Sequence, residues 1–345
     1  MKLNLGLDRF SGIYLLVIFV IVFSLLAPST FPTMTTLHII ASSQAAVGVV
    51  AIAILIPLIA GQFDLSIGVN ANLAGVVALM LQTNGILGAI PAALVGIGIG
   101  LVIGGLNGLL VVVFKVNSFI ATLAMTSVLS AVLLMVTGSE EVPPGEYGPF
   151  QQLTQTDIFG FQSVILFTIA LAFVAWWVIE RTPQGRYLRA VGQNPEAARL
   201  TGLPVNRLVW MSLVASGGIA AFGGVLVVSS TGPSLDFGPG LLLPTFAAAF
   251  LGSTQIQPGR ENVWGTLIAI LVLAVGVQGL QLVTGVVWVA PLFNGLALMV
   301  AVALAVGRQS RVTRSKARPP GDALEATRGE HVVGQATAEG VTSAT

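Results

Sequence analysis

The sequence predicts an all-α fold, a polytopic transmembrane bundle of about ten helices with the N-terminus and the C-terminus both cytoplasmic. Three observations lead to this prediction. Of the 345 residues, 55% are hydrophobic and only 8% are charged, whereas a soluble domain is about 25% charged. Apolar runs long enough to cross a bilayer recur along the chain. The basic residues fall in alternate connecting segments.

A helical span needs about 20 mainly apolar residues, and the chain offers about ten runs of this kind. The third and the eighth are the shortest or most interrupted, and an even number of spans places both termini on one side. The runs cover 12–28, 38–61, 65–83, 88–113, 118–137, 162–180, 208–230, 241–256, 263–283 and 288–306.

The charges support this count of spans. All 15 Lys and Arg residues fall in segments that an inner N-terminus places in the cytoplasm, as the positive-inside rule requires. A different number of spans would mix basic and acidic segments. We therefore expect a multi-pass membrane protein, with the lipid bilayer and no nucleic acid as its surroundings. The predicted outer segments carry Glu140, Glu141, Glu146, Asp157 and Asp236.

The chain divides into a predicted transmembrane domain, residues 1–306, and a basic and polar tail, residues 307–345, which we expect to be disordered. Lys2 and Arg9 precede the first apolar run, which we interpret as a retained span rather than a cleaved signal peptide. Cysteine is absent, and His38 and His331 lie far apart. We therefore expect no metal site, no cofactor and no enzymatic chemistry.

The predicted inner loop 181–207 contains a short helix with clear boundaries. Asn194 suits the N-cap, Pro195 suits the first helical position, and Gly202 suits the end. Glu196 complements the positive end of the helix dipole. About two turns are too few to be stable alone in water, so the membrane domain or a partner must hold this helix. The alternative is a plain surface linker.

Glu196-Ala197-Ala198, followed by Gly202, resembles the EAA loop of ABC-importer permeases. Three further stretches, with the segment 185–194, resemble the ribose- and xylose-type sugar permeases in particular. These stretches are Gly61-Gln-Phe-Asp64-Leu-Ser66-Ile-Gly68, Asn117-Ser-Phe119-Ile120-Ala-Thr122-Leu123, and Phe250-Leu-Gly252-Ser-Thr254 with Gly259 and Trp264-Gly265-Thr266-Leu267. Three departures bear on the substrate: Asn117 replaces a common proline, Gln278 replaces an asparagine, and 241–244 lacks an acidic residue.

The resemblance covers about residues 10–306 and implies the permease subunit of an ATP-binding cassette importer for a monosaccharide or related polyol. It also implies a separate ATPase subunit, an external substrate-binding protein and a permease homodimer. The chain has no G-x-x-x-x-G-K-[ST] phosphate loop, in keeping with a separate ATPase. The residues implied to couple to the ATPase are Gly185, Arg186, Asn194, Pro195, Glu196, Ala197, Ala198, Arg199 and Gly202.

Polar residues within the predicted spans are candidates for the lining of a sugar pathway, because neutral amides and hydroxyls suit a polyhydroxylated substrate. Their alternative role is hydrogen bonding between helices, and Asp64 or Ser66 has the further alternative of capping the third helix. The candidates are Gln44, Asp64, Ser66, Asn70, Asn72, Asn107, Thr122, Thr126, Ser130, Gln278, Gln281 and Asn294.

Glycines recur at four-residue spacing in the fourth span, at Gly96, Gly100, Gly104 and Gly108. This spacing predicts one smooth helix face that allows close helix packing.

Two alternative functions remain. A branched-chain amino-acid or nucleoside permease of the same superfamily is disfavoured mildly, because no span contains a Lys or Arg to pair with a carboxylate. An ion-coupled secondary transporter would need several carboxylates within the membrane, and only Asp64 comes close.

Overall fold

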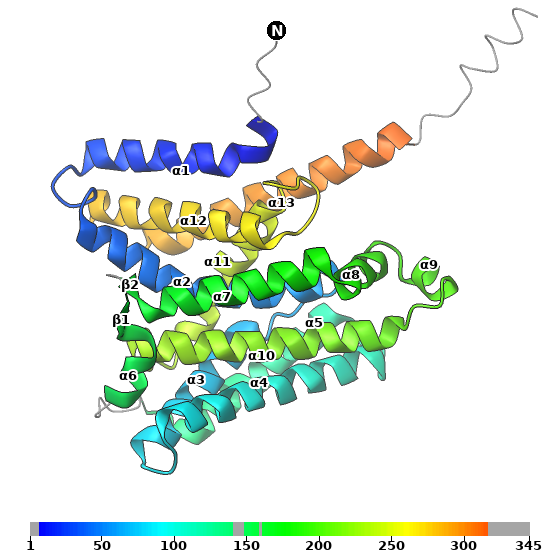
Figure 1. The fold of residues 1–345 in the computed structure, drawn as a ribbon, viewed down its shortest axis with the longest axis horizontal. Helices are drawn as coiled ribbons and strands as arrows, with labels where there is room; N and C mark the ends of the chain where they lie inside the picture. The colour runs from blue at the N-terminus through cyan, green and yellow to red at the C-terminus, as the bar shows by residue number, and fades with distance from the viewer. Residues whose placement is uncertain (1–6, 141–147, 159–160, 317–345) are drawn as a thin grey trace, which may run out of the picture. The chain divides into compact units, whose positions relative to one another are not determined.

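The computed structural model describes residues 7–140, 148–158 and 161–316 (Figure 1). The chain divides into two compact units, residues 1–305 and 306–345. Only the helical segment 306–316 is described in the second unit, so most of the predicted tail, with His331, lies outside the described residues. The same is true of the predicted outer residues Glu141 and Glu146.

Within the described chain, helices form nearly all of the regular structure. Each predicted apolar run overlaps a helix, and the third and eighth runs correspond to α3 and α11, which are among the shorter apolar helices. The helices that overlap these runs are α1 (Leu7–Leu26), α2 (Met34–Ile59), α3 (Ile67–Thr83), α4 (Ala89–Val112), α5 (Ser118–Thr137), α7 (Ser163–Trp176), α10 (Val205–Thr231), α11 (Phe237–Gly252), α12 (Val263–Thr284) and α13 (Val289–Lys316).

Among the residues that the structure describes, six helical segments are long and apolar enough to cross a membrane: α2, α4, α5, residues 163–181, α10 and α12. The others in the apolar set are shorter, namely Phe10–Leu26, Ile67–Thr83, Phe237–Gly252 and Val289–Leu304. The fold is therefore a polytopic, all-α bundle.

The predicted loops contain elements that the hydropathy pattern did not indicate. The segment 138–161 includes α6 (Gly148–Gln155) and a small antiparallel hairpin of β1 (Asp157–Ile158) and β2 (Phe161–Gln162). The predicted sixth span ends in a π-helical turn, η1 (Trp177–Arg181). The predicted loop 181–207 contains α8 (Pro183–Gln193), which was not expected, as well as the expected short helix, α9 (Pro195–Leu200). Figure 1 places α8 and α9 at one end of the first unit and α6, β1 and β2 at the opposite end.

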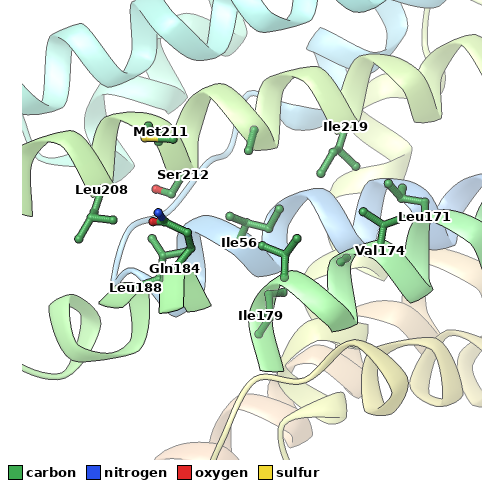
Figure 2. A pocket seen from close by; sticks show the side chains of 13 residues that line it. Ile56, Leu171, Val174, Ile179, Gln184, Leu188, Leu208, Met211, Ser212 and Ile219 are labelled. Carbon is green, nitrogen blue, oxygen red and sulfur yellow. The ribbon is translucent and has the colours of Figure 1, made fainter. Parts of the chain in front are cut away.

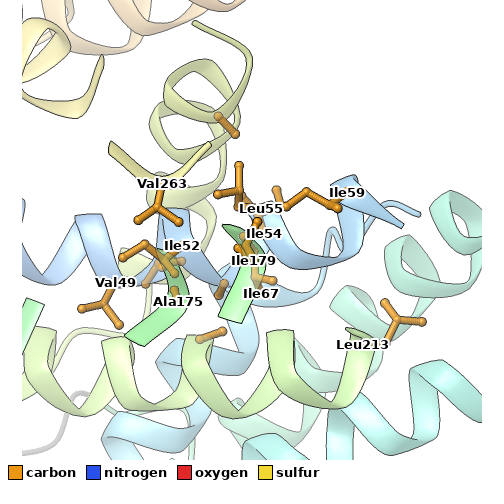
Figure 3. Packing of buried hydrophobic residues seen from close by; sticks show 14 of the residues in the cluster. Val49, Ile52, Ile54, Leu55, Ile59, Ile67, Ala175, Ile179, Leu213 and Val263 are labelled. Atoms are coloured by element: carbon orange, nitrogen blue, oxygen red, sulfur yellow. The ribbon is translucent and has the colours of Figure 1, made fainter. Parts of the chain in front are cut away.

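Helix α2 lies at the centre of the packing. Val49–Leu55 are fully buried on all sides of the helix (Figure 3), as expected for a helix that is hydrophobic all round. In contrast, the apolar side chains Leu94, Val102 and Val128 are more than half exposed. An apolar outer surface around a buried apolar core is typical of a protein whose solvent is lipid.

Glycines bring the helix backbones together, as the spacing in α4 predicts. A methyl group on Gly104 would overlap the carbonyl oxygen of Leu213 in α10, and one on Gly100 would overlap that of Gly217. Helices α3 and α11 also cross backbone to backbone. There, a Cβ on Gly68 would overlap the Gly238 carbonyl oxygen, and a Cβ on Gly238 would lie 2.7 Å from the Gly68 carbonyl oxygen.

Candidate functional site

Helix α9 has the boundaries that its sequence predicts. The Asn194 side-chain oxygen accepts the Ala197 N–H at 3.0 Å, and Pro195 opens the first turn. Gly202 ends the helix with a φ of 83°, and its N–H donates to the Arg199 carbonyl at 2.9 Å. A positive φ of this kind is readily adopted only by glycine.

The outward side of α9 is open to solvent. Glu196 and Arg199 form an exposed ion pair of 3.0 Å, and Leu200, which the sequence analysis did not single out, is 90% exposed. Only Ala198 among the α9 residues is buried. In the described structure, α9 is therefore covered only at Ala198.

Helix α8 attaches α9 to the bundle. Its buried residues Gly185, Leu188 and Val191 recur every three positions and form one face. Arg189 is ion-paired with Glu180 of η1, and both side chains are largely buried. A methyl group on Gly185 would overlap the Ile179 carbonyl oxygen. Arg186, an implied coupling residue, is instead exposed.

Gly192, near the end of α8, contacts the end of α2. A methyl group there would overlap the carbonyl oxygen of Ile59 and would lie 3.1 Å from the backbone nitrogen of Gly61. Gly61 has a φ of 73° and begins the turn out of α2, three residues after Leu58 and four after Pro57. The α8–α9 hairpin, residues 183–200, therefore touches the non-helical segment 60–66, which we call the helix break.

Side chains of α5 hold the helix break. The Phe63 N–H donates to the Ser118 hydroxyl at 3.1 Å, and the Leu65 N–H donates to the Thr122 hydroxyl at 3.0 Å. The Thr126 hydroxyl donates to the Leu65 carbonyl at 3.1 Å. Irregular backbone inside a membrane protein needs such partners, because lipid offers none.

Asp64 is the centre of a buried hydrogen-bond network at the helix break. Its carboxylate accepts the hydroxyl of Ser66 at 2.7 Å, the hydroxyl of Ser216 in α10 at 2.8 Å, and the N–H of Ser66 at 3.1 Å. The Asn107 amide of α4 donates to the Ser66 hydroxyl at 2.8 Å. Ser66 precedes α3 without a side-chain capping bond. The network joins the helix break to α4 and α10.

Two neighbouring asparagines bond to backbone carbonyls of other elements. The Asn70 amide donates to Gly217 at 3.1 Å, and the Asn72 amide donates to Leu235 at 2.7 Å. Both side chains are buried, as is Asn107, and their side-chain oxygens have no hydrogen-bond partner in the structure.

The predicted pathway residues therefore fall into separate groups. Asp64, Ser66, Asn107, Thr122 and Thr126 meet at the helix break, in bonds already described. No hydrogen bond within the described residues joins Gln278 and Gln281 on α12 or Asn294 on α13 to this network. Gln44 donates to Ser43 at 3.4 Å, and the Ser130 hydroxyl bonds to Thr126 in its own helix.

Sequence reasoning missed several supporting residues. Ser118 precedes Thr122 and Thr126 at fourfold spacing on α5, and Ser216 follows Ser212 by four residues on α10, so only this spacing marks each as part of a polar helix face. Asn117, which departs from the family's proline, caps α5 by accepting the Phe119 N–H at 2.9 Å.

Asn262 orders the segment between α11 and α12. Its amide reaches the carbonyls of Gly252, Gln255 and Arg260, each at 3.1 Å. Its side-chain oxygen caps α12 at Gly265 with a bond of 2.7 Å. The conformation of this part of the family-like stretch 250–267 thus depends on one side chain.

An apolar cavity of about 270 Å³ lies beside the α8–α9 hairpin (Figure 2). Ile56 of α2, Leu171 and Val174 of α7, Leu188 of α8 and Met211 of α10 are among its lining residues. Gln184 and Ser212 are its polar lining residues among those described, and the Ser212 hydroxyl already donates to the Val209 carbonyl, so the cavity offers few hydrogen-bonding partners to a polar substrate.

Comparison with known proteins supports the pattern of these motifs. A probable ABC transporter permease of Sinorhizobium fredii is 31% identical over 256 residues, 74% of this chain and 76% of the relative. A ribose import permease of Bacillus subtilis is 32% identical over 305 residues, 86% of this chain and 92% of the relative. A fructose import permease of Rhizobium meliloti is 30% identical over 302 residues, 84% and 82% of the two chains.

The family described as the permease component of branched-chain amino acid transport systems matches residues 36–307. This match spans the helix break, the α8–α9 hairpin and the segment around Asn262. Together with the apolar helices, it identifies a multi-pass protein of the bacterial inner membrane. The chain belongs to this family of transport-system permeases.

Proposed function

We propose that this chain is the membrane permease subunit of an ATP-binding cassette importer that carries a monosaccharide or related polyol. The observation that supports this proposal most directly is the α8–α9 hairpin. Its exposed, capped helix α9 is attached through Gly192 to the helix break at Gly61. The names of the ribose and fructose import permeases among its relatives support a sugar as cargo.

The proposed complex includes a separate ATPase subunit that grips α9, an external substrate-binding protein that delivers the sugar, and a second copy of the permease. The apolar helices form ten spans, and both termini and the α8–α9 hairpin face the cytoplasm. The charge sorting of the sequence supports this orientation, since Arg186, Arg189 and Arg199 lie in the hairpin and Arg181 and Arg207 flank it.

Force on α9 reaches the membrane helices by direct packing in this proposal. A displacement of α9 moves α8, and the Gly192 backbone then acts on Ile59 and Gly61. The helix break responds as a hinge, because it is the non-helical link between α2 and α3. The Asp64 network transmits the change to α4 and α10 through Asn107 and Ser216.

In this proposal, the polar candidates at the helix break and in the neighbouring helices position the helices and do not line the sugar pathway. Asp64, Asn70, Asn72, Asn107 and Thr122 are all fully buried, and each bonds to protein groups. Such bonds between membrane helices are typically worth about 0.6 kcal/mol each.

The function is tested by reconstituting the permease with its ATPase and binding protein in proteoliposomes. We expect uptake of radiolabelled D-ribose or D-fructose that requires ATP and survives a proton uncoupler. ATP-driven uptake of L-leucine in place of either sugar would favour the amino-acid alternative. Uptake that survives ATP depletion and fails with the uncoupler would favour a secondary transporter.

A further inference from the structure

A second cavity, of about 420 Å³, lies at the end of the bundle opposite the α8–α9 hairpin. It is bounded by the first turns of α2, by Gln162 at the end of β2, and by the last two residues of α10. Among the described residues, no Asp, Glu, Lys or Arg lines it. Its polar lining includes Thr35, His38, Ser42, Ser43, Gln162 and Thr231.

Much of this polar lining is free to bind a ligand. Among the described residues, the side chains of Thr35, His38, Ser42 and Gln162 make no hydrogen bond to protein. The Ser43 hydroxyl, in contrast, donates to the Ile39 carbonyl at 2.7 Å. The four free groups supply both donors and acceptors, as hydroxyl, imidazole and amide.

An aromatic ring orders the imidazole. The rings of His38 and Phe161 meet edge to face, with centroids 5.4 Å apart and an interplanar angle of 63°. Ring packing thus orients His38, and among the described residues its ring nitrogens make no hydrogen bond to protein. Met34 and Ile39 add apolar surface to the same cavity.

The packing below the cavity closes it toward the middle of the bundle. Ala45, Ala46, Val49 and Val50 of α2 are buried. The Thr168 hydroxyl of α7 donates to the Ala45 carbonyl at 2.8 Å, and a Cβ on Gly223 of α10 would lie 2.6 Å from a Val50 methyl group. A ligand in the cavity would therefore rest at one end of the bundle.

We propose that this cavity is a low-affinity binding site for a neutral, polyhydroxylated sugar, occupied when the binding protein releases its cargo. The proposal rests on the proposed function and its orientation, in which this end of the bundle is external. The volume falls in the range of about 300–1,000 Å³ that is typical of small-molecule sites. Free neutral donors and acceptors match hydroxyl groups, and the absence of Asp, Glu, Lys and Arg disfavours a zwitterionic amino acid. Weak binding is required here, since tight binding would stall the passage of the cargo.

The absence of native cysteine allows a direct test. A Ser42→Cys permease, assembled with its ATPase and binding protein in nanodiscs, is labelled with a membrane-impermeant maleimide. D-ribose or D-fructose, whichever supports uptake, is added at about ten times the dissociation constant of its complex with the permease. We expect the sugar to slow labelling of the cysteine about tenfold. Thr35→Cys is the second reporter, in case Ser42→Cys folds poorly.

Asn84→Cys is the matched control, because Asn84 is exposed in the turn that joins α3 and α4 and does not line the cavity. Its labelling should be unchanged by the sugar. Slowing of both reporters by the ligand-free binding protein, with none by the sugar, would instead make the cavity a docking surface and overturn the proposal. If the sugar slows labelling of neither cysteine in a preparation that retains ATP-driven uptake, the sugar site alone would be overturned. Loss of that uptake from the wild-type complex would overturn the proposed function.

Discussion

Gly192 of α8 lies against the carbonyl oxygen of Ile59, the last residue of α2, so closely that a methyl group on Gly192 would overlap it. Both partners at this contact are backbone atoms, and neither is the end of a flexible side chain. The contact therefore fixes the α8–α9 hairpin to the point where α2 ends. This relationship leads to the first prediction.

Gly192→Ala should separate the hairpin from the helix break. We expect a loss of about 1–3 kcal/mol in stability from the steric overlap, and a loss of ATP-driven uptake of about tenfold or more from impaired coupling. Gly98→Ala is the matched control, since no atom lies within 4 Å of the added methyl. Thermal unfolding in detergent and uptake in proteoliposomes measure both effects. Wild-type uptake by Gly192→Ala would remove this contact from the mechanism.

Glu196→Arg should impair coupling with little effect on folding. Glu196 is exposed and its ion pair with Arg199 is a surface pair, so its loss costs about 0–1 kcal/mol. A reversed charge should still weaken binding to the ATPase at α9 and abolish the stimulation of ATP hydrolysis by loaded binding protein. Glu140→Arg is the control, because Glu140 is exposed just beyond α5. Equal stimulation in both variants would contradict the proposal.

Asp64→Asn should preserve ATP-driven uptake. An amide keeps one acceptor oxygen, and its NH₂ group can donate to the Ser216 hydroxyl, which also accepts. We expect a modest loss of about 1 kcal/mol in stability. Asp64→Leu should cost about 1–3 kcal/mol for each buried group left without its partner.

Uptake and thermal unfolding of both Asp64 variants are compared in the same proteoliposome and detergent preparations. An Asp64→Asn protein that is stable but inactive would show that transport requires the charge of the carboxylate, as an ion-coupled mechanism does.

Thr122→Val should destabilise the helix break, because the partly buried Leu65 N–H loses its acceptor. We expect a loss of about 1–3 kcal/mol. Ser130→Ala is a suitable comparison, since that hydroxyl bonds only to Thr126 within α5. Proteolysis of the segment 60–66 and thermal unfolding report the difference. Equal stability of the two variants would mean that α5 does not hold the helix break.

Leu200→Cys tests the orientation of the whole chain. Leu200 is highly exposed at the end of α9, so an introduced thiol should react readily. In intact cells we expect no labelling by a membrane-impermeant maleimide, and rapid labelling after the cells are broken. Asn84→Cys should show labelling in both cases. Labelling of Leu200→Cys from outside would place the hairpin on the external face and end the coupling proposal.

The hydropathy pattern located the long helices because each apolar run reflects a local requirement of the bilayer. The glycine spacing from Gly96 to Gly108 likewise predicted a packing face that the structure confirms. The boundaries of α9 were also predictable, since Asn194, Pro195 and Gly202 act within one or two turns.

Long-range contacts account for what the sequence could not show. Ser216 meets Asp64 from 152 residues away, and no local pattern pairs them. Helix α8 was missed because its apolar face has only a few members and because one of its packing partners, Ile59, is more than 100 residues away in the sequence. The β1–β2 hairpin is too short for alternation of apolar residues to reveal it.

The crossing of α3 and α11 at Gly68 and Gly238 constrains how this protein can evolve. Most tight helix contacts tolerate a larger residue on one side if the other side becomes smaller. Here both sides already have the smallest residue, and each α-carbon faces the opposite main chain. A substitution at Gly68 therefore has no compensating change at Gly238, and selection for restored function should yield reversion or changes elsewhere.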